Sequence, residues 1–170
     1  MNKIAFSIAV TVVCFTCTTG TANAKQCNVS STYKEGIQYI DQTCNRTELL
    51  AMIPALQAAG ALNPDITQTQ INVMPNMLAE AIEMESAPIN LKVAFKNPKV
   101  KQVNYEMSLE VADDYGNLEK HLIVKFSMPR TTASKINWEN FGGEQLPHIV
   151  HMYFTPWFSQ NVQGEIGAEQ

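Results

Sequence analysis

The second half of the chain alternates apolar and polar residues with a period of two. Apolar side chains occupy every second position of 103–111 and most second positions of 118–128, and a turn-forming cluster at 113–117 separates the two runs. Because successive side chains of a strand point to opposite faces of a sheet, this pattern predicts two antiparallel strands joined as a hairpin. We expect one face of the hairpin to be buried and the other to face solvent.

A similar alternation covers residues 89–95, before a turn at Asn97 and Pro98. It predicts a further strand, which makes a three-stranded, or four-stranded, antiparallel meander with the hairpin. The apolar positions of this run are Ile89, Leu91, Val93 and Phe95, and the polar positions are Asn90, Lys92 and Lys96.

The buried faces of the two hairpin strands have to match, which restricts their register. We expect Glu106 to lie opposite Lys125 and Glu110 to lie opposite His121, unless a β-bulge intervenes. A slip of two residues would place Glu110 opposite Glu119, and like charges directly across a strand pair are destabilising.

The first half of the chain has apolar residues at helical spacing. We expect a helix over 32–44, a second helix that Asn45 caps and Gly60 ends, with Pro54 inside it, and a third from Pro75 that closes at 86–88. The apolar positions of the first helix are Tyr33, Ile37, Ile40 and Cys44.

The C-terminal part predicts a broken helix. Residues 134–141 favour a short helix, 146–154 carry an apolar stripe at helical spacing, and Thr155 with Pro156 is typical of a cap that starts a new helical turn. The fold class is therefore α+β: N-terminal helices, then the antiparallel β-meander, covered by a C-terminal broken helix. We expect a single domain over 25–170, with a frayed tail from about residue 163. In outline this arrangement resembles the cystatin-like and NTF2-like cones.

The first 24 residues predict a cleaved signal peptide. Lys3 provides the positive start, residues 4–15 are almost entirely apolar, and Ala22-Asn23-Ala24 fits a cleavage site after Ala24. The apolar run is short of the about 20 residues that span a bilayer, so a membrane anchor is the weaker interpretation and we expect no transmembrane segment after removal of the signal peptide. The Met-Asn-Lys start favours a bacterial leader and a periplasmic, or secreted, protein.

Two of the four cysteines lie beyond the predicted cleavage site. In an oxidising compartment, Cys27 and Cys44 predict one disulfide. A redox pair or half of a metal site are the competing interpretations, but the two residues do not form a C-x-x-C motif and have no histidine nearby.

Charge and composition restrict the partner. The chain is 45% apolar, which excludes a disordered protein, and its net charge of −4 argues against binding to nucleic acid or anionic lipid. No nucleotide-binding glycine loop, hydrolase elbow or H-E-x-x-H motif is present, so the sequence predicts no cofactor.

Two groups of residues were candidates for chemistry. Glu144, His148 and His151 would share one face of a helix and could bind zinc, although Pro147 interrupts them and a solvated polar face is the simpler interpretation. His121 beside Glu110 could form an acid–base pair, with a surface ion pair as the simpler interpretation.

Two surfaces were candidates for binding. A basic patch that includes Lys92 and Lys96 could dock an acidic partner or could protect a strand edge. A small hydrophobic ligand could bind between the sheet and the C-terminal helix. The residues that would line that pocket are Tyr105, Met107, Phe126, Met128, Tyr153 and Trp157.

The main functional hypothesis is a non-catalytic, exported protein-binding module with a protein partner in the cell envelope, such as an inhibitor, an immunity protein or an accessory factor of an envelope machine. The alternative is a small hydrophobic-ligand-binding domain. A third hypothesis is a small hydrolase that uses His121 or the pair His148 and His151.

Overall fold

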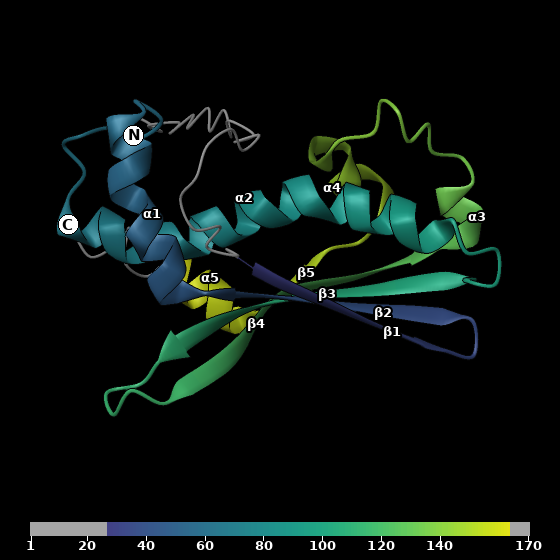
Figure 1. The fold of residues 1–170 in the computed structure, drawn as a ribbon, viewed down its shortest axis with the longest axis horizontal. Coiled ribbons are helices and arrows are strands. Elements are labelled where there is room, and N and C mark those ends of the chain that lie inside the picture. The colour runs from purple at the N-terminus through teal and green to yellow at the C-terminus, as the bar shows by residue number, and fades with distance from the viewer. Residues whose placement is uncertain (1–26, 164–170) are drawn as a thin grey trace, which may run out of the picture.

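The computed structural model describes residues 27–163, which form a five-stranded mixed sheet with helices on one of its faces (Figure 1). The predicted signal peptide and most of the predicted frayed tail lie outside the described residues. The elements are β1 (Cys27–Lys34), β2 (Ile37–Asn45), α1 (Arg46–Ala58), α2 (Gln68–Phe95), β3 (Gln102–Ala112), β4 (Leu118–Pro129), α3 (Arg130–Ala133), the 3-10 turn η1 (Gly143–Gln145), α4 (Leu146–Ile149), β5 (Tyr153–Phe154) and α5 (Pro156–Gln163).

The strands lie in the order in which they occur in the chain. β1 and β2 form an antiparallel hairpin, β2 pairs parallel with β3, and β3, β4 and β5 continue antiparallel. Parallel neighbours need a long crossover connection, and α1 with α2 provides it. The α+β class is thus confirmed, but the sheet is mixed and begins with strands rather than helices.

The helix predicted over 32–44 is wrong, because β1 and β2 occupy this segment. The reason is the two-residue turn at Glu35 and Gly36, whose φ angles of 52° and 90° lie in the left-handed region. Such a turn joins two antiparallel strands and cannot lie within a helix. The β-branched and aromatic residues on both sides of the turn then favour extended backbone.

The strand predicted over 89–95 is also wrong, because this segment is the last part of α2. Leu91 and Phe95 are buried against the sheet, whereas Ile89 and Val93 are exposed. The apolar residues of 89–95 fit the period of a strand and also that of a helix. The two that are buried, Leu91 and Phe95, are four residues apart, as on one face of a helix. α2 also starts before Pro75, at a capping box that Thr67 and Gln70 form.

Three local predictions are confirmed. The side chain of Asn45 accepts hydrogen bonds from the backbone N–H groups of Thr47 and Glu48 and caps α1, which contains Pro54. β3 and β4 coincide with the predicted hairpin strands, and Asp113 organises the turn between them by accepting from the backbone of Tyr115 and Asn117.

The hairpin register agrees with the prediction on one side of a bulge. Glu106 lies opposite Lys125, as expected. A β-bulge between Met107 and Ser108 then shifts the register by one residue, so that Glu110 lies opposite Lys120 instead of His121.

The C-terminal helix is broken more strongly than expected. No helix forms over 134–141, and residues 146–154 contain the four-residue helix α4 and the short strand β5 in place of a continuous helix. The predicted cap is confirmed, since Thr155 Oγ accepts a hydrogen bond from the N–H of Phe158 at the start of α5. α5 packs against β4 and α2.

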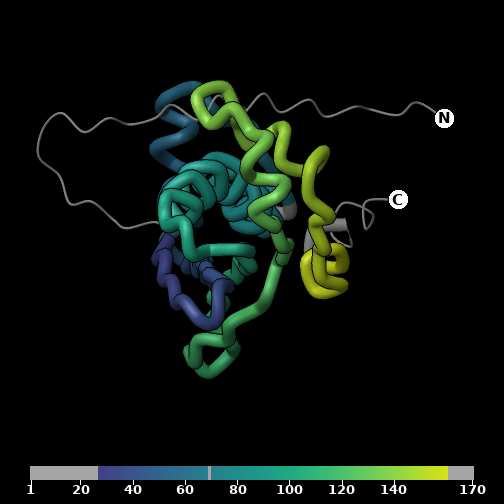
Figure 2. Tube along the Cα trace, turned by 90° about the vertical axis from the view of Figure 1, so that its right-hand side faces the viewer, coloured from purple at the N-terminus to yellow at the C-terminus, as the bar shows by residue number. Residues whose placement is uncertain are grey.

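The helices and the sheet form two layers, and the core lies between them. Figure 2 looks along α2, so that the helices and the sheet are seen end-on as two layers, with β1 at one side of the sheet and the C-terminal segment at the other. The inward-facing side chains include Ile40, Val103, Tyr105, Met107 and Leu109, all buried against the helices. We call this side of the sheet the inner face and the opposite side the outer face.

The predicted disulfide is present. Cys27 and Cys44 lie directly opposite each other on β1 and β2, with Cα atoms 4.1 Å apart. The bond ties the start of the edge strand β1 to the interior of the sheet, where Cys44 is fully buried.

Candidate functional site

The outer face of the sheet is polar, and most of its side chains are at least partly exposed. Alternation along each strand brings a row of hydroxyl, amide and charged side chains to this face, because the neighbouring residues turn inward. From β2 to β5 the row includes Tyr39, Asp41, Thr43, Asn104, Glu106, Lys120, Lys125, Ser127 and Tyr153.

Two adjoining hollows mark this face. The first, of about 330 Å³, lies over β1, β2 and β3, and the second, of about 470 Å³, continues towards β4 and β5. Tyr39, Asn104 and Glu106 line both of them. The second hollow also reaches His151 and Tyr153, so the hollows together extend across the sheet.

Two tyrosines stand out on this polar face. Tyr39 on β2 is 41% exposed and Tyr153 on β5 is 46% exposed. They belong to different strands, with β3 and β4 between them. Three strand spacings of about 4.8 Å put their strands roughly 14 Å apart.

Opposite charges alternate between the tyrosines. Lys120 Nζ lies 2.5 Å from Asp41 Oδ2, an ion pair that reaches across β3. Glu106 lies opposite Lys125, whose ammonium group is 5.4 Å from the centre of the Tyr153 ring. The face thus presents aromatic rings, hydrogen-bonding groups and balanced charges.

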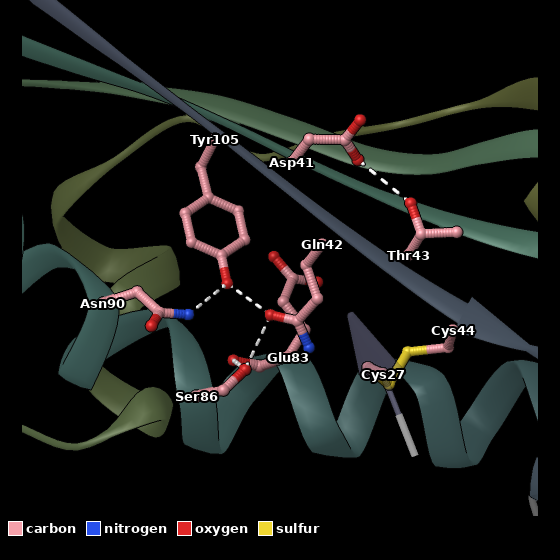
Figure 3. The surroundings of a disulfide bond; sticks show 9 residues. All are labelled: Cys27, Asp41, Gln42, Thr43, Cys44, Glu83, Ser86, Asn90 and Tyr105. Carbon is pink, nitrogen blue, oxygen red and sulfur yellow. Dashed lines mark hydrogen bonds between the residues drawn. A yellow bond between two sulfur atoms is a disulfide. The ribbon is translucent and has the colours of Figure 1, made fainter. Parts of the chain in front are cut away.

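The inner face contains a second polar feature, a buried hydrogen-bond cluster close to the disulfide (Figure 3). The Tyr105 hydroxyl and the Ser86 hydroxyl both donate to the side-chain oxygen of Gln42, the latter over 2.8 Å. Asn90 Nδ2 donates to the Tyr105 hydroxyl oxygen over 3.0 Å. The cluster joins α2 to β2 and β3 at the centre of the two layers.

Glu83 lies beside this cluster and is fully buried, and neither of its carboxyl oxygens has a hydrogen-bond partner among the described residues. Burial, and secondarily the charge of Glu80, raise the pKa of Glu83 to about 8. Burial also raises the pKa of Tyr105 to about 12. Both groups therefore carry their protons at neutral pH, which removes the cost of a buried charge.

Sequence reasoning missed this cluster and half of the outer-face site. A helix that continues to residue 95 aligns Glu83 with Ala79, Ala87 and Leu91 on the buried side, and the length of this helix was not predicted. Tyr39 and Asp41 were missed because their segment was predicted as a helix. The signal that could have revealed them was the turn at Glu35 and Gly36, flanked on both sides by β-branched and aromatic residues.

The residues predicted to bind a ligand or partner are dispersed. Tyr105 and Phe126 border the second hollow while their side chains pack into the core, and Met107 is fully buried. Tyr153 is on the outer face. Trp157 on α5 stacks on His121, with ring centres 4.2 Å apart.

The basic residues and the metal candidates lie elsewhere. Lys92 on α2 forms an ion pair with Glu139, and Lys96 is exposed at the end of that helix. Glu144, His148 and His151 are exposed in η1, in α4 and in the loop before β5. Within residues 27–163, no group of three His, Cys, Asp or Glu side chains is placed to hold a metal ion.

His121 does not meet Glu110. Its Nε2 lies 3.5 Å from a carboxylate oxygen of Glu119, and its ring is stacked on Trp157. The carboxylate of Glu119 and the indole ring of Trp157 therefore orient the imidazole of His121.

Comparison of the chain with family models, curated proteins and solved structures found no match. None of the helices in the described part of the chain is long and apolar enough to cross a membrane.

Proposed function

We propose that the protein is a non-catalytic, exported binding module that docks a partner protein on the outer face of its sheet. The observation that carries this proposal is the pair of adjoining hollows between Tyr39 and Tyr153. Tyrosine is enriched at the centres of protein interfaces because it provides a large rigid area at a small cost in conformational entropy.

The charges around the tyrosines favour a protein partner over a single charged small molecule. Asp41 and Glu106 alternate with Lys120 and Lys125, so a partner that complements the face must itself carry both signs. A folded protein surface has this property, and matched charges of both signs give specificity.

The compartment proposed is the periplasm or the exterior of the cell. Disulfides persist in oxidising environments, and the Cys27–Cys44 bond agrees with the export that the leader predicts. An inhibitor, an immunity protein and an accessory factor of an envelope machine all remain within this proposal.

The alternative of a hydrophobic ligand between the sheet and the C-terminal helix has less support. Tyr105 and Met107 would have to line that pocket, and both are fully buried in the core. The hollow that Tyr153 lines is on the outer face of the sheet, which is the side away from the core.

The proposal is tested by capture of partners from an envelope extract of the native host, with Tyr39→Ala and Tyr153→Ala as site variants. Tyr115→Ala is the matched control, because Tyr115 is 91% exposed at the tip of the β3–β4 hairpin, away from the hollows. We expect a stoichiometric partner that the wild type and the control retain and that both site variants lose, with a decrease in affinity of roughly thirtyfold, corresponding to about 2 kcal/mol. Equal capture by all four proteins would refute the proposed surface.

A further inference from the structure

The edge strand β1 is exposed along almost its whole length. Seven of its eight residues are exposed, and β1 pairs only with β2 in the part of the chain that the structure describes. An unpaired edge presents a row of backbone N–H and C=O groups that can accept another strand.

β1 lacks the features that normally protect an edge. Residues 27–33 contain neither a charged residue nor a proline, and Lys34 at the last position is the only charge in the strand. At the opposite side of the sheet, β5 pairs with β4, and Thr155 continues the coverage by donating to the carbonyl oxygens of Leu122 and Ile123. β5 is only two residues long, and very short edge strands discourage strand addition just as charges and proline do, so the two edges differ in their readiness to pair.

The turn between β1 and β2 determines which backbone groups point outward. A two-residue turn makes Lys34 and Ile37 a hydrogen-bonded pair, and such pairs then alternate along the hairpin. The backbone groups of Val29, Ser31 and Tyr33 consequently point away from β2, towards any strand that would be added.

A second copy of β1 can pair antiparallel with this edge about a twofold axis at Ser31 or about one at Ser30, and the first register fits better. If two copies pair antiparallel about a twofold axis at Ser31, Val29 of each copy lies opposite Tyr33 of the other, and about six new hydrogen bonds form. Val29 and Tyr33 are 47% and 46% exposed on the inner-face side of the strand. An aromatic residue opposite a β-branched residue is a favourable cross-strand pair.

Charge supports the same register. Lys34 would lie opposite Asn28 of the other copy, and no like charges would face each other along the strand pair. The alternative axis at Ser30 would place Val29 opposite Ser31 and Tyr33 opposite Cys27, so neither exposed apolar side chain would gain an apolar partner.

We propose that the protein forms a homodimer in which the two β1 strands pair antiparallel about Ser31 and join the two sheets into one. This inference is independent of the partner proposed above. The outer faces of the two copies would lie on the same side of the joined sheet. A single strand pair buries a small interface, so the dimer is of the weak, concentration-dependent kind.

A charge-swap experiment tests the dimer and its register together. Only a residue on the twofold axis faces its own copy, so Ser31→Lys and Ser31→Glu should each oppose dimer formation, and an equimolar mixture of the two should restore it. Sedimentation velocity over a range of protein concentrations measures the association of each variant and of the mixture.

We expect a wild-type monomer–dimer equilibrium, at least a fivefold weaker dimer for each Ser31 variant alone, and recovery in the mixture, where fivefold is about the factor of a strong cross-strand pair. Ser30→Lys is the matched control: its lysine would face Thr32 of the other copy, so the dimer should persist. The proposal is overturned if the wild type is monomeric at every concentration, if the mixture fails to associate, or if Ser30→Lys weakens the dimer as much as the Ser31 variants do. Circular dichroism of each variant establishes that it is folded.

Discussion

The two faces of the sheet differ in how deeply their polar groups are buried. The inner face holds the apolar core and a buried polar cluster in which the hydroxyl groups of Tyr105 and Ser86 both donate to Gln42. The outer face holds polar side chains around two hollows, with the ion pair between Asp41 and Lys120, which stays half exposed. Substitutions on the two faces should therefore have different consequences, because desolvated groups contribute far more to stability than exposed ones.

Glu83 should give the largest effect on the inner face. The ordinary pKa of a glutamate side chain is 4.5, whereas the pKa of Glu83 in the folded protein is about 8. The native state therefore keeps a proton that the unfolded state releases as the pH rises. With respect to this group, the free energy of unfolding of the wild type should thus be highest below about pH 4.5. It should decrease as the pH rises from about 4.5 to about 8, by roughly 4 to 5 kcal/mol in all, and level off above that.

Glu83→Gln should remove most of this pH dependence, since an amide cannot ionise. Urea denaturation at several pH values measures the free energy of unfolding, and Glu85→Gln on the exposed side of the same helix is the control that should follow the wild type. Parallel pH profiles for Glu83→Gln and the wild type would contradict the role of the buried carboxyl.

The disulfide should have the next largest effect. Replacement of both Cys27 and Cys44 by alanine removes a constraint on the unfolded chain across a separation of 17 residues. The expected loss is about 3 kcal/mol, which lowers the melting temperature by roughly 10 °C for a domain of this size. Calorimetry measures the shift, and the reduced wild type should behave like the double variant. An unchanged melting temperature would mean that the β1–β2 hairpin is stable without the covalent bond.

The ion pair on the outer face should have the smallest effect. Asp41→Ala removes the partner of Lys120, and because both side chains are more than 40% exposed we expect a loss of about 0.5 kcal/mol or less. The same denaturation experiment measures it, with Lys120→Ala and the double variant completing a double-mutant cycle. A loss above about 2 kcal/mol would show that this face contributes to the core and would break the contrast between the faces.

How far the sequence predicts the fold depends on whether a segment is specified locally. β3, β4 and α1 were predicted because alternation and the Asn45 cap are local signals. The segment 32–44 was assigned wrongly because its two-residue turn was not recognised, and the segment 89–95 because its apolar residues fit both periods. Contacts distant in sequence decide between the periods: β2 pairs with β3, and α2 packs on the sheet.

The candidate site follows the same rule. Glu106, Lys125 and Tyr153 could be named from the sequence, and the pairing of Glu106 with Lys125 could be predicted from face matching. Tyr39 and Asp41 reach the site only through the parallel pairing of β2 with β3, which no local pattern indicates. The burial of Glu83 likewise depends on the length of α2 and on the sheet beneath it.

The parallel pairing at the centre of the sheet has a consequence for the order in which the molecule can assemble. The hairpin of β1 and β2 closes through neighbouring residues, so its cysteines can meet while the polypeptide is still emerging. Ile37 and Gln102, which are partners in the middle of the sheet, cannot meet until the whole crossover has been made and has collapsed. Formation of the Cys27–Cys44 disulfide should accordingly precede packing of the core. The disulfide then holds β2 in place in the hairpin, so that β3 can pair with it once the crossover is complete.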